Sequence, residues 1–303
     1  MGQTLTEPVT TKTTESTFNS HYKVGSSCMQ GWRTNMEDAH THILSLPKAK
    51  EVAFFGVFDG HGVVDRKGGA MFSNKRKVEE AIKEGFLELD EQMVGDSQLV
   101  REEVAGTTAV TILIKDSVIY CGNAGDSRAI ASVSGKAIEL SIDHKPSNEA
   151  ESARIYAAGG YVEGDRVNGN LALSRALGDF GYKQVSDKSA KQQIVTAEPE
   201  IKKLEITQDV EFLVLACDGI WDVMSSQEVV DFCRKRLAEE KEPEQVCEEL
   251  LDHCLAPAND SEGVGGDNMT VIIVCLLQNQ STQKYVKRLS TPPRLSTSPA
   301  KQE

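Results

Sequence analysis

Short hydrophobic runs alternate irregularly with amphipathic segments along most of the chain. Six runs are rich in β-branched and aromatic residues, as buried strands are; they span 52–58, 108–114, 118–121, 129–133, 211–217 and 270–277. Hydrophobic residues recur at helical spacing in four segments, 77–93, 147–158, 226–239 and 244–255, and Ser226 is typical of a helix start. The short gap between 114 and 118 favours an antiparallel hairpin. The pattern therefore predicts an α+β layered fold.

The two ends differ from the middle of the chain. Residues 1–20 are rich in threonine and contain one bulky aromatic side chain, Phe18. Residues 278–303 hold three of the nine prolines, with five basic residues and one acidic residue. Such compositions favour mobility. We therefore expect a mobile N-terminal segment at 1–20, one domain at 21–277 and a disordered basic tail at 278–303.

The charge and the cysteines restrict the class of protein. With 46 acidic and 33 basic residues in 303, the net charge is −13, which argues against a nucleic-acid binder. No apolar run approaches the roughly 20 residues that cross a bilayer, and a signal-peptide pattern is missing. The seven cysteines are scattered and odd in number, which favours reduced thiols in a cytosolic or nuclear protein over a disulfide framework.

Acidic residues recur at the ends of predicted strands. Asp59 and Asp218 directly follow strands, Asp267 lies just before one, and Glu37 and Asp38 precede a further expected strand at 39–46. In an antiparallel sheet the end of one strand adjoins the start of its neighbour, so these five acids could meet at one edge. A single Asp-Gly after a strand is more often a turn, but the repeated placement favours a metal site.

A cluster of unpaired carboxylates needs a positive charge to offset its repulsion. Hard divalent cations prefer oxygen ligands, and the absence of clustered histidines and cysteines favours Mg²⁺ or Mn²⁺ over Zn²⁺. Gly60, which follows Asp59, leaves room for a backbone carbonyl to join the ligands.

Eight motifs occur in the order found in the protein phosphatase 2C family, and over about 22–277 the chain resembles these metal-dependent serine/threonine phosphatases. The motifs are MQGWRTNMEDAH (29–40), FDGHG (58–62), AGTTA (105–109), NAGDSR (123–128), DHKP (143–146), LSRALGD (173–179), ACDGIWD (216–222) and DNMT (267–270). The resemblance implies a four-layer αββα sandwich of two antiparallel β-sheets flanked by helices, with two Mn²⁺ or Mg²⁺ ions per chain.

The same resemblance implies the metal-binding residues, which are Glu37, Asp38, Asp59, Gly60, Asp218 and Asp267. In that assignment Asp59 bridges the two ions, Glu37 and the Gly60 carbonyl serve one of them, and Asp38 lies behind the direct ligands. Asp126 and Asp222 resemble ligands of a weaker third ion that some members bind. Asp222 follows a Gly-Ile-Trp turn, and the alternative is that it only bonds the backbone.

The family resemblance also implies two catalytic residues, Arg33 and His61. Arg33 matches a phosphate clamp, and its planar fork can hold two oxygens. His61 matches a general acid for the leaving serine or threonine oxygen, while a hydroxide between the two cations attacks phosphorus. The cysteine-based alternative needs Cys-x5-Arg, and Cys28 and Arg33 are one residue too close.

Three further stretches of the sequence need separate interpretations. Residues 63–77 depart from the family pattern, being too short for its long outer helix; the departure is a splice form, a gene-model error or a true variant. We expect this departure to reduce the stability of the protein, and the alternative function is a catalytically impaired phosphoprotein-binding scaffold.

Arg175 and Asp179 are expected to form an ion pair beside the cleft, within 164–195. Residues 143–145 look like a polar turn without a catalytic role.

The N-terminal sequence and the family together suggest location and partners. Gly2 begins a sequence that fits N-myristoylation, although such a start is also common by chance. One acyl chain supports only reversible membrane association. We expect a monomer that acts on phosphoprotein substrates in the cytoplasm, the nucleus or both, without nucleic-acid partners.

Overall fold

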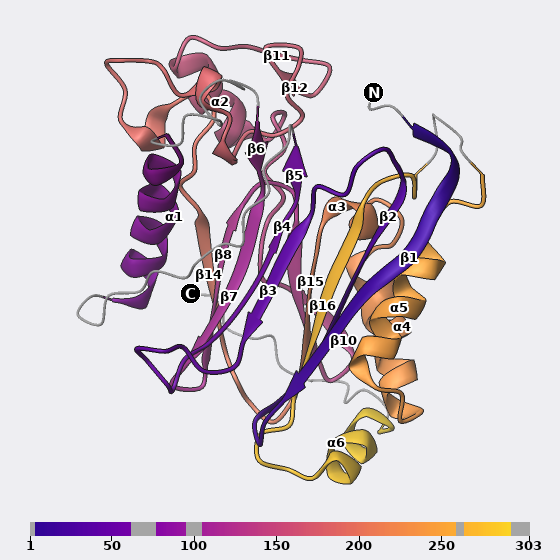
Figure 1. Ribbon diagram of the computed structural model, residues 1–303. Helices are drawn as coiled ribbons and strands as arrows, with labels where there is room; N and C mark the ends of the chain where they lie inside the picture. Colours follow the sequence, from indigo (N-terminus) through magenta and orange to yellow (C-terminus); the bar gives the residue numbers. More distant parts are fainter. Residues whose placement is uncertain (1–3, 62–76, 95–104, 259–263, 292–303) are drawn as a thin grey trace.

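Two antiparallel sheets packed face to face form the centre of the computed structural model, which describes residues 4–61, 77–94, 105–258 and 264–291 (Figure 1). The strands of the first sheet are, in spatial order, β1 (Thr4–Phe18), β2 (Tyr22–Arg33), β16 (Met269–Leu276), β15 (Val210–Ala216), β9 (Arg128–Val133) and β10 (Lys136–Glu139). The strands of the second are β14 (Glu200–Glu205), β8 (Val118–Ala124), β7 (Ala109–Lys115), β4 (Ala53–Phe58) and β3 (Ala39–Ile43).

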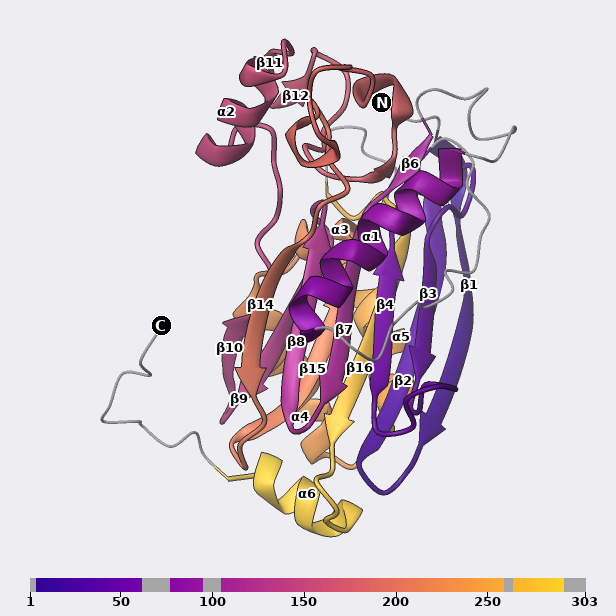
Figure 2. The same ribbon diagram turned by 90° about the vertical axis from the view of Figure 1, so that its left-hand side faces the viewer.

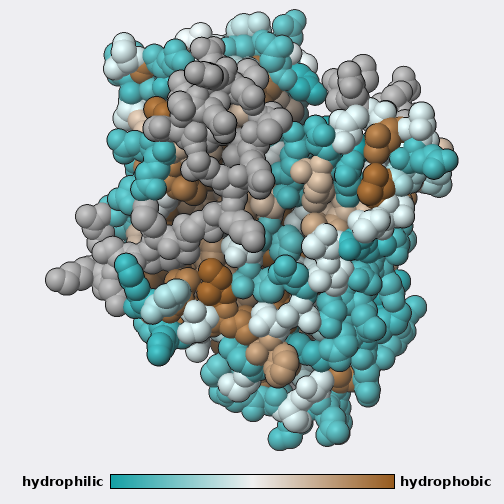
Figure 3. Space-filling view, viewed as in Figure 1, coloured by the Kyte–Doolittle hydropathy of each residue, from teal (hydrophilic) through white to brown (hydrophobic). Residues whose placement is uncertain are grey.

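Helices cover the outer faces of both sheets. α4 (Ser226–Ala238) and α5 (Pro243–Cys254) pack on the six-stranded sheet, and α1 (Val78–Val94) lies across the five-stranded sheet (Figure 2). The side of the molecule over α4 and α5 is largely hydrophilic (Figure 3), as expected of helices that bury one face and expose the other. The predicted four-layer α+β sandwich is confirmed.

The central strands bury both faces, which explains their continuous hydrophobic runs. In β15, Phe212 and Val214 belong to the core beneath α4 and α5, whereas Leu213 and Leu215 belong to the core between the sheets. Successive side chains of a strand point to opposite faces, so alternate residues serve two different cores.

The predicted elements agree closely with the observed ones, with small shifts at their ends. The run 211–217 is β15, and the segment 226–239 is α4. The cap of α4 is Ser225, one residue before the predicted Ser226; its hydroxyl accepts a hydrogen bond from the Glu228 N–H.

A smaller region covers one end of the sandwich. Its elements, with the short strands and turns that join it, are β5 (Gly60–His61), β6 (Gly106–Thr107), α2 (Glu149–Ala157), β11 (Val162–Glu163), β12 (Arg166–Val167), β13 (Leu177–Gly178), η1 (Phe180–Tyr182) and η2 (Ala190–Gln192). At the same end, α3 (Asp218–Trp221) follows β15 directly. This end carries the acidic residues that the sequence singled out.

The expectation of a mobile segment at 1–20 is wrong for its described residues. Thr4–Phe18 forms β1, which pairs with β2 along most of its length. Threonine is β-branched and favours strands, so the same threonines that suggested mobility instead support an edge strand. Contacts with α5 hold it, because Lys12 Nζ lies 2.6 Å from Asp252 Oδ1 and Thr14 Oγ1 donates to Glu248 Oε1 over 2.7 Å.

The expectation of disorder at 278–303 is wrong for residues 278–291. α6 (Thr282–Leu289) begins after Ser281, whose hydroxyl accepts from the Lys284 N–H, and it buries Tyr285 and Leu289 against the sandwich. Residues 292–303 lie outside the described residues. Among the helices that the structure describes, none has both the length and the apolar composition that a membrane crossing requires.

Candidate metal centre

Acidic residues from the strand ends of both sheets meet in one cleft of about 420 Å³. Asp59 follows β4 of the five-stranded sheet, whereas Asp218 and Asp267 flank β15 and β16 of the six-stranded sheet. The acids therefore gather between two sheets at one end of the sandwich, rather than along one edge of a single sheet. The candidate residues that line this cleft are Arg33, Glu37, Asp59, Gly60, His61, Asp126, Asp218 and Asp267.

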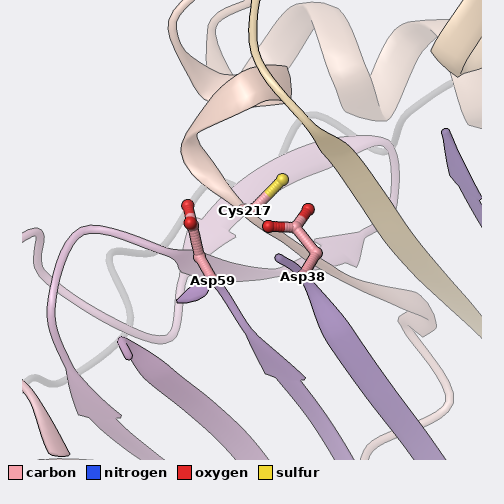
Figure 4. A group of neighbouring side chains, drawn as sticks. All are labelled: Asp38, Asp59 and Cys217. Atoms are coloured by element: carbon pink, nitrogen blue, oxygen red, sulfur yellow. The ribbon is translucent and has the colours of Figure 1, made fainter. Parts of the chain in front are cut away.

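Asp38 lies beneath the cleft beside Asp59. One ligand atom from each of Asp38, Asp59 and Cys217 falls within 4.8 Å of the others (Figure 4). Thr270 Oγ1 donates to Asp38 Oδ2 over 2.7 Å, whereas Asp38 Oδ1 is buried and lacks a hydrogen-bond partner. A buried carboxylate oxygen without a partner is costly unless a cation or a proton meets it.

Burial and mutual repulsion make three of these acids reluctant to ionise. Burial raises the pKa of Asp38 to about 6. Burial, followed by the charges of Asp38 and Asp218, raises the pKa of Asp59 well above its usual range. Burial and the charge of Asp126 do the same for the pKa of Asp218. Bound cations would reverse this penalty by stabilising the charged carboxylates.

Cys217 is a member of the cluster that sequence reasoning did not include. Its thiol is buried, and burial together with the charges of Asp38 and Asp59 raises its pKa well above the usual range. A protonated thiol is a poor metal ligand, so the effective donors are carboxylate and carbonyl oxygens. That donor set fits Mg²⁺ or Mn²⁺, as expected from the sequence.

Asn268 holds the loop that carries Glu37. Its Oδ1 accepts from the Glu37 N–H over 2.9 Å, and its Nδ2 donates to the carbonyls of Gln30 and Asn35. Gly60 packs so closely on this loop that an added Cβ would overlap the Glu37 carbonyl oxygen. The Asp267-Asn268 motif therefore positions a second loop through Asn268, which is buried with only 6% of its surface exposed. The sequence alone did not indicate this role.

Arg33, at the end of β2, forms an ion pair with Asp267. Asp267 Oδ1 also accepts from the Asn268 N–H over 2.7 Å. The Arg33 side chain is 40% exposed, so its guanidinium remains within reach of a ligand in the cleft.

His61 contacts Asp179 instead of standing alone at the cleft. Its Nε2 lies 2.9 Å from both carboxylate oxygens of Asp179, which is fully buried. Burial alone lowers the pKa of His61, but the hydrogen bond and charge of Asp179 outweigh it, so the pKa is raised. A Cβ on Gly106 would overlap Asp179, which explains a glycine at this point.

The expected ion pair between Arg175 and Asp179 is wrong. Arg175 Nη2 instead lies 2.6 Å from Glu151 Oε1, and Arg154 Nη1 lies 2.6 Å from Glu151 Oε2. Glu151 lies on α2 and is almost fully buried, so both guanidinium groups serve to neutralise it.

Asp126 and Asp222 differ in their surroundings. Asp126 is buried and pairs with Lys145, a residue of the turn to which the sequence assigned no role. Asp222 is exposed at the end of α3, does not line the cleft, and its N–H donates to the Asp218 carbonyl over 2.8 Å. Gly2 and most of the atypical stretch 63–77 lie outside the described residues.

Comparisons with known proteins agree with this arrangement. Residues 22–263 match the family model described as protein phosphatase 2C. A probable protein phosphatase 2C of Caenorhabditis elegans is 56% identical over 96% of this chain and 85% of its own length. Protein phosphatase 2C homolog 2 of Schizosaccharomyces pombe is 46% identical over 94% of this chain and 81% of its own length. A solved phosphatase structure from Toxoplasma gondii covers 88% of this chain and 96% of its own, with a TM-score of 0.73 and 25% identity.

The sandwich, the acidic cleft and these matches define a serine/threonine protein phosphatase of the metal-dependent class. The chain belongs to the protein phosphatase 2C family. The family resemblance that the motifs suggested is therefore confirmed.

Proposed function

We propose that this phosphatase hydrolyses phosphoserine and phosphothreonine in proteins at the acidic cleft, with two Mn²⁺ or Mg²⁺ ions. The residues that would hold the ions are Glu37, Asp59, Gly60, Asp218 and Asp267, with Asp38 behind them. The observation that carries the proposal is the gathering of Asp38, Asp59 and Asp218, whose raised pKa values show that their ionised forms are unfavourable without nearby positive charge.

The proposed chemistry divides between the cations and the protein. When bound, the cations supply an activated water nucleophile and offset the negative charge around phosphorus. Arg33 orients the substrate, because its half-exposed guanidinium can donate two parallel hydrogen bonds to phosphate oxygens. Asp267 holds the guanidinium at the cleft until a phosphate arrives.

His61 would protonate the leaving oxygen of serine or threonine. Asp179 engages Nε2, so the transferable proton resides on Nδ1. The raised pKa keeps more of the ring in its protonated form near neutral pH, as a general acid requires.

Hydrolysis of p-nitrophenyl phosphate and of a phosphothreonine peptide, with and without Mn²⁺, tests the proposal. We expect Mn²⁺-dependent activity that falls by at least about 100-fold in Asp59→Asn and Asp218→Asn. Asp209→Asn removes an exposed acid from the turn just before β15 and is the matched control. Metal-independent binding of a phosphoprotein without hydrolysis would instead favour the scaffold function.

Location and assembly extend the same proposal. We infer a monomer that acts in the cytoplasm or nucleus and associates reversibly with membranes when Gly2 is myristoylated. Mass spectrometry of the N-terminal peptide from cells and light scattering of the purified protein test these two points. An unmodified Gly2, or a dimer at micromolar concentration, would contradict them.

A further inference from the structure

The loop between β8 and β9 presents a buried carboxylate to the cleft, and a lysine already meets it. Asp126 has a side chain only 5% exposed, and its Oδ2 accepts from Lys145 Nζ. The Lys145 side chain itself is 35% exposed, so the partner of this buried carboxylate remains accessible to solvent.

The backbone that carries Lys145 is held firmly against the β8–β9 loop. The His144 N–H donates to the Gly125 carbonyl over 3.0 Å. Arg128 binds both carboxylate oxygens of Asp143, with distances of 3.0 and 2.7 Å. These contacts flank Lys145 and Asp126, so the two side chains are brought together by the fold and not by the reach of one flexible side chain.

The ammonium group of Lys145 acts on more than one acid. Its charge interacts with Asp218 and Asp222 as well as with Asp126. These three acids are the ones expected to serve a weaker third cation. A tethered ammonium and a divalent cation repel each other at such short range, so the ammonium group should weaken the binding of a cation to Asp126.

We propose that Lys145 is a tethered cation that competes with a divalent cation for Asp126, so that a third ion binds more weakly while the ammonium group stays in place. The inference rests on the proposed function, because it concerns the position beside the two-ion centre. It explains how the chain neutralises Asp126 without a metal ion. It also assigns to Lys145 the control of the cation concentration at which the third position fills.

Mn²⁺ binding to the full chain tests this proposal without relying on activity. The binding is measured by calorimetry and by the electron paramagnetic resonance signal of free Mn²⁺. Lys145→Met should tighten the weakest Mn²⁺ site about tenfold and leave the tighter sites nearly unchanged. Lys145→Arg, which keeps the charge, and Lys136→Met, which removes an equal charge from exposed strand β10, should leave the weakest site as in the wild type. Adding Asp126→Asn to Lys145→Met should abolish the gain.

The outcomes separate this inference from the proposed function. An unchanged weakest site in Lys145→Met, with the tighter sites intact, overturns the role of Lys145 alone. An equal gain in Lys136→Met also overturns it, because the effect would then be one of net charge. Absence of any Mn²⁺ binding overturns both. Lys145→Gln is the second variant if the methionine variant melts at a lower temperature than the wild type.

Discussion

The Nε2 nitrogen of His61 lies 2.9 Å from each carboxylate oxygen of Asp179, a residue with no exposed surface. The contact joins the strand end that carries Asp59 to the region covering the cleft. A buried carboxylate that engages one ring nitrogen fixes the orientation of the ring and favours its protonated form.

Asp179→Asn should lower the pKa of His61, because the neutral amide removes the charge that raised it. The protonated ring is the donor, so activity on a phosphothreonine peptide falls as pH rises through this pKa. In the variant that fall moves to lower pH, and kcat/KM at pH 8 drops by about tenfold or more. p-Nitrophenyl phosphate, whose leaving group needs little protonation, should show a much smaller change.

Two variants serve as controls for the His61 prediction. Asp187→Asn neutralises an exposed acid in the same covering region and should leave the pH profile in place. Gly106→Ala adds a methyl group that overlaps Asp179, so it should reproduce the loss with the peptide substrate. Identical pH profiles for wild type and Asp179→Asn would show that Asp179 does not act through His61.

Asp218→Asn should have opposite effects on stability with and without metal. The pKa of Asp218 is raised, so its ionised form destabilises the metal-free protein at pH 7. Neutralising it should raise the metal-free Tm by about 2–4 °C, which corresponds to roughly 1 kcal/mol. Millimolar Mn²⁺ should then raise the Tm of the wild type far more than that of the variant. Thermal melts that move in parallel in both conditions would count against a cation site at Asp218.

Stability should also depend on pH through Glu151. Burial alone raises the pKa of Glu151, but hydrogen bonds and charges from Arg175 and Arg154 outweigh it and lower the pKa from 4.5 to about 2. A lowered folded-state pKa stabilises the protein above the unfolded pKa, here by about 3 kcal/mol. That contribution is lost as pH falls from about 4.5 toward 2.

Urea unfolding of wild type and Glu151→Gln measures this loss. The difference in unfolding free energy should be large at pH 7 and should shrink steadily below pH 4.5, because protonated Glu151 resembles glutamine. Glu163→Gln, at an exposed position on β11, is the control and should match the wild type throughout. A difference that stays constant with pH would contradict the prediction.

A chain that begins at Asn19 should be less stable by about 2–4 kcal/mol, because it lacks β1. β2 would then become an unprotected edge of the six-stranded sheet and should promote aggregation. Denaturant unfolding and light scattering measure the two effects. Phe18→Ser changes a side chain that is 80% exposed and should shift stability by less than about 0.5 kcal/mol. Equal stability of the shortened chain would support the original expectation of a mobile segment.

The sequence predicted most elements because their signals are local. Runs such as 211–217 are hydrophobic throughout, and the acids that follow them could be located without knowing how the strands pair. The threonine-rich start was misjudged because polar β-branched residues can form either an edge strand or an extended mobile chain. What decides between them is pairing with β2 and contacts with α5, which are distant in sequence.

The partners of the site residues could not be predicted for the same reason. Asp179 lies four residues after Arg175, a spacing that suggests a local ion pair, yet each binds a residue from another element. Lys145 and Cys217 carried no signal of their own, since one belonged to an ordinary polar turn and the other to a buried strand end. Tertiary packing decides such pairings.

The pairing of β2 with β16 joins the two extremes of the domain, with Met29 opposite Met269 and Tyr22 opposite Leu276. During synthesis the β1–β2 hairpin emerges before the other strands of this sheet, and an isolated hairpin is at best marginally stable. Its permanent neighbour is translated some 240 residues later, about 12 to 50 s at ordinary rates of elongation. The central sheet, and with it the cleft, can therefore close only after β16 has been translated. Until then the nascent chain depends on the ribosome or on chaperones to protect it.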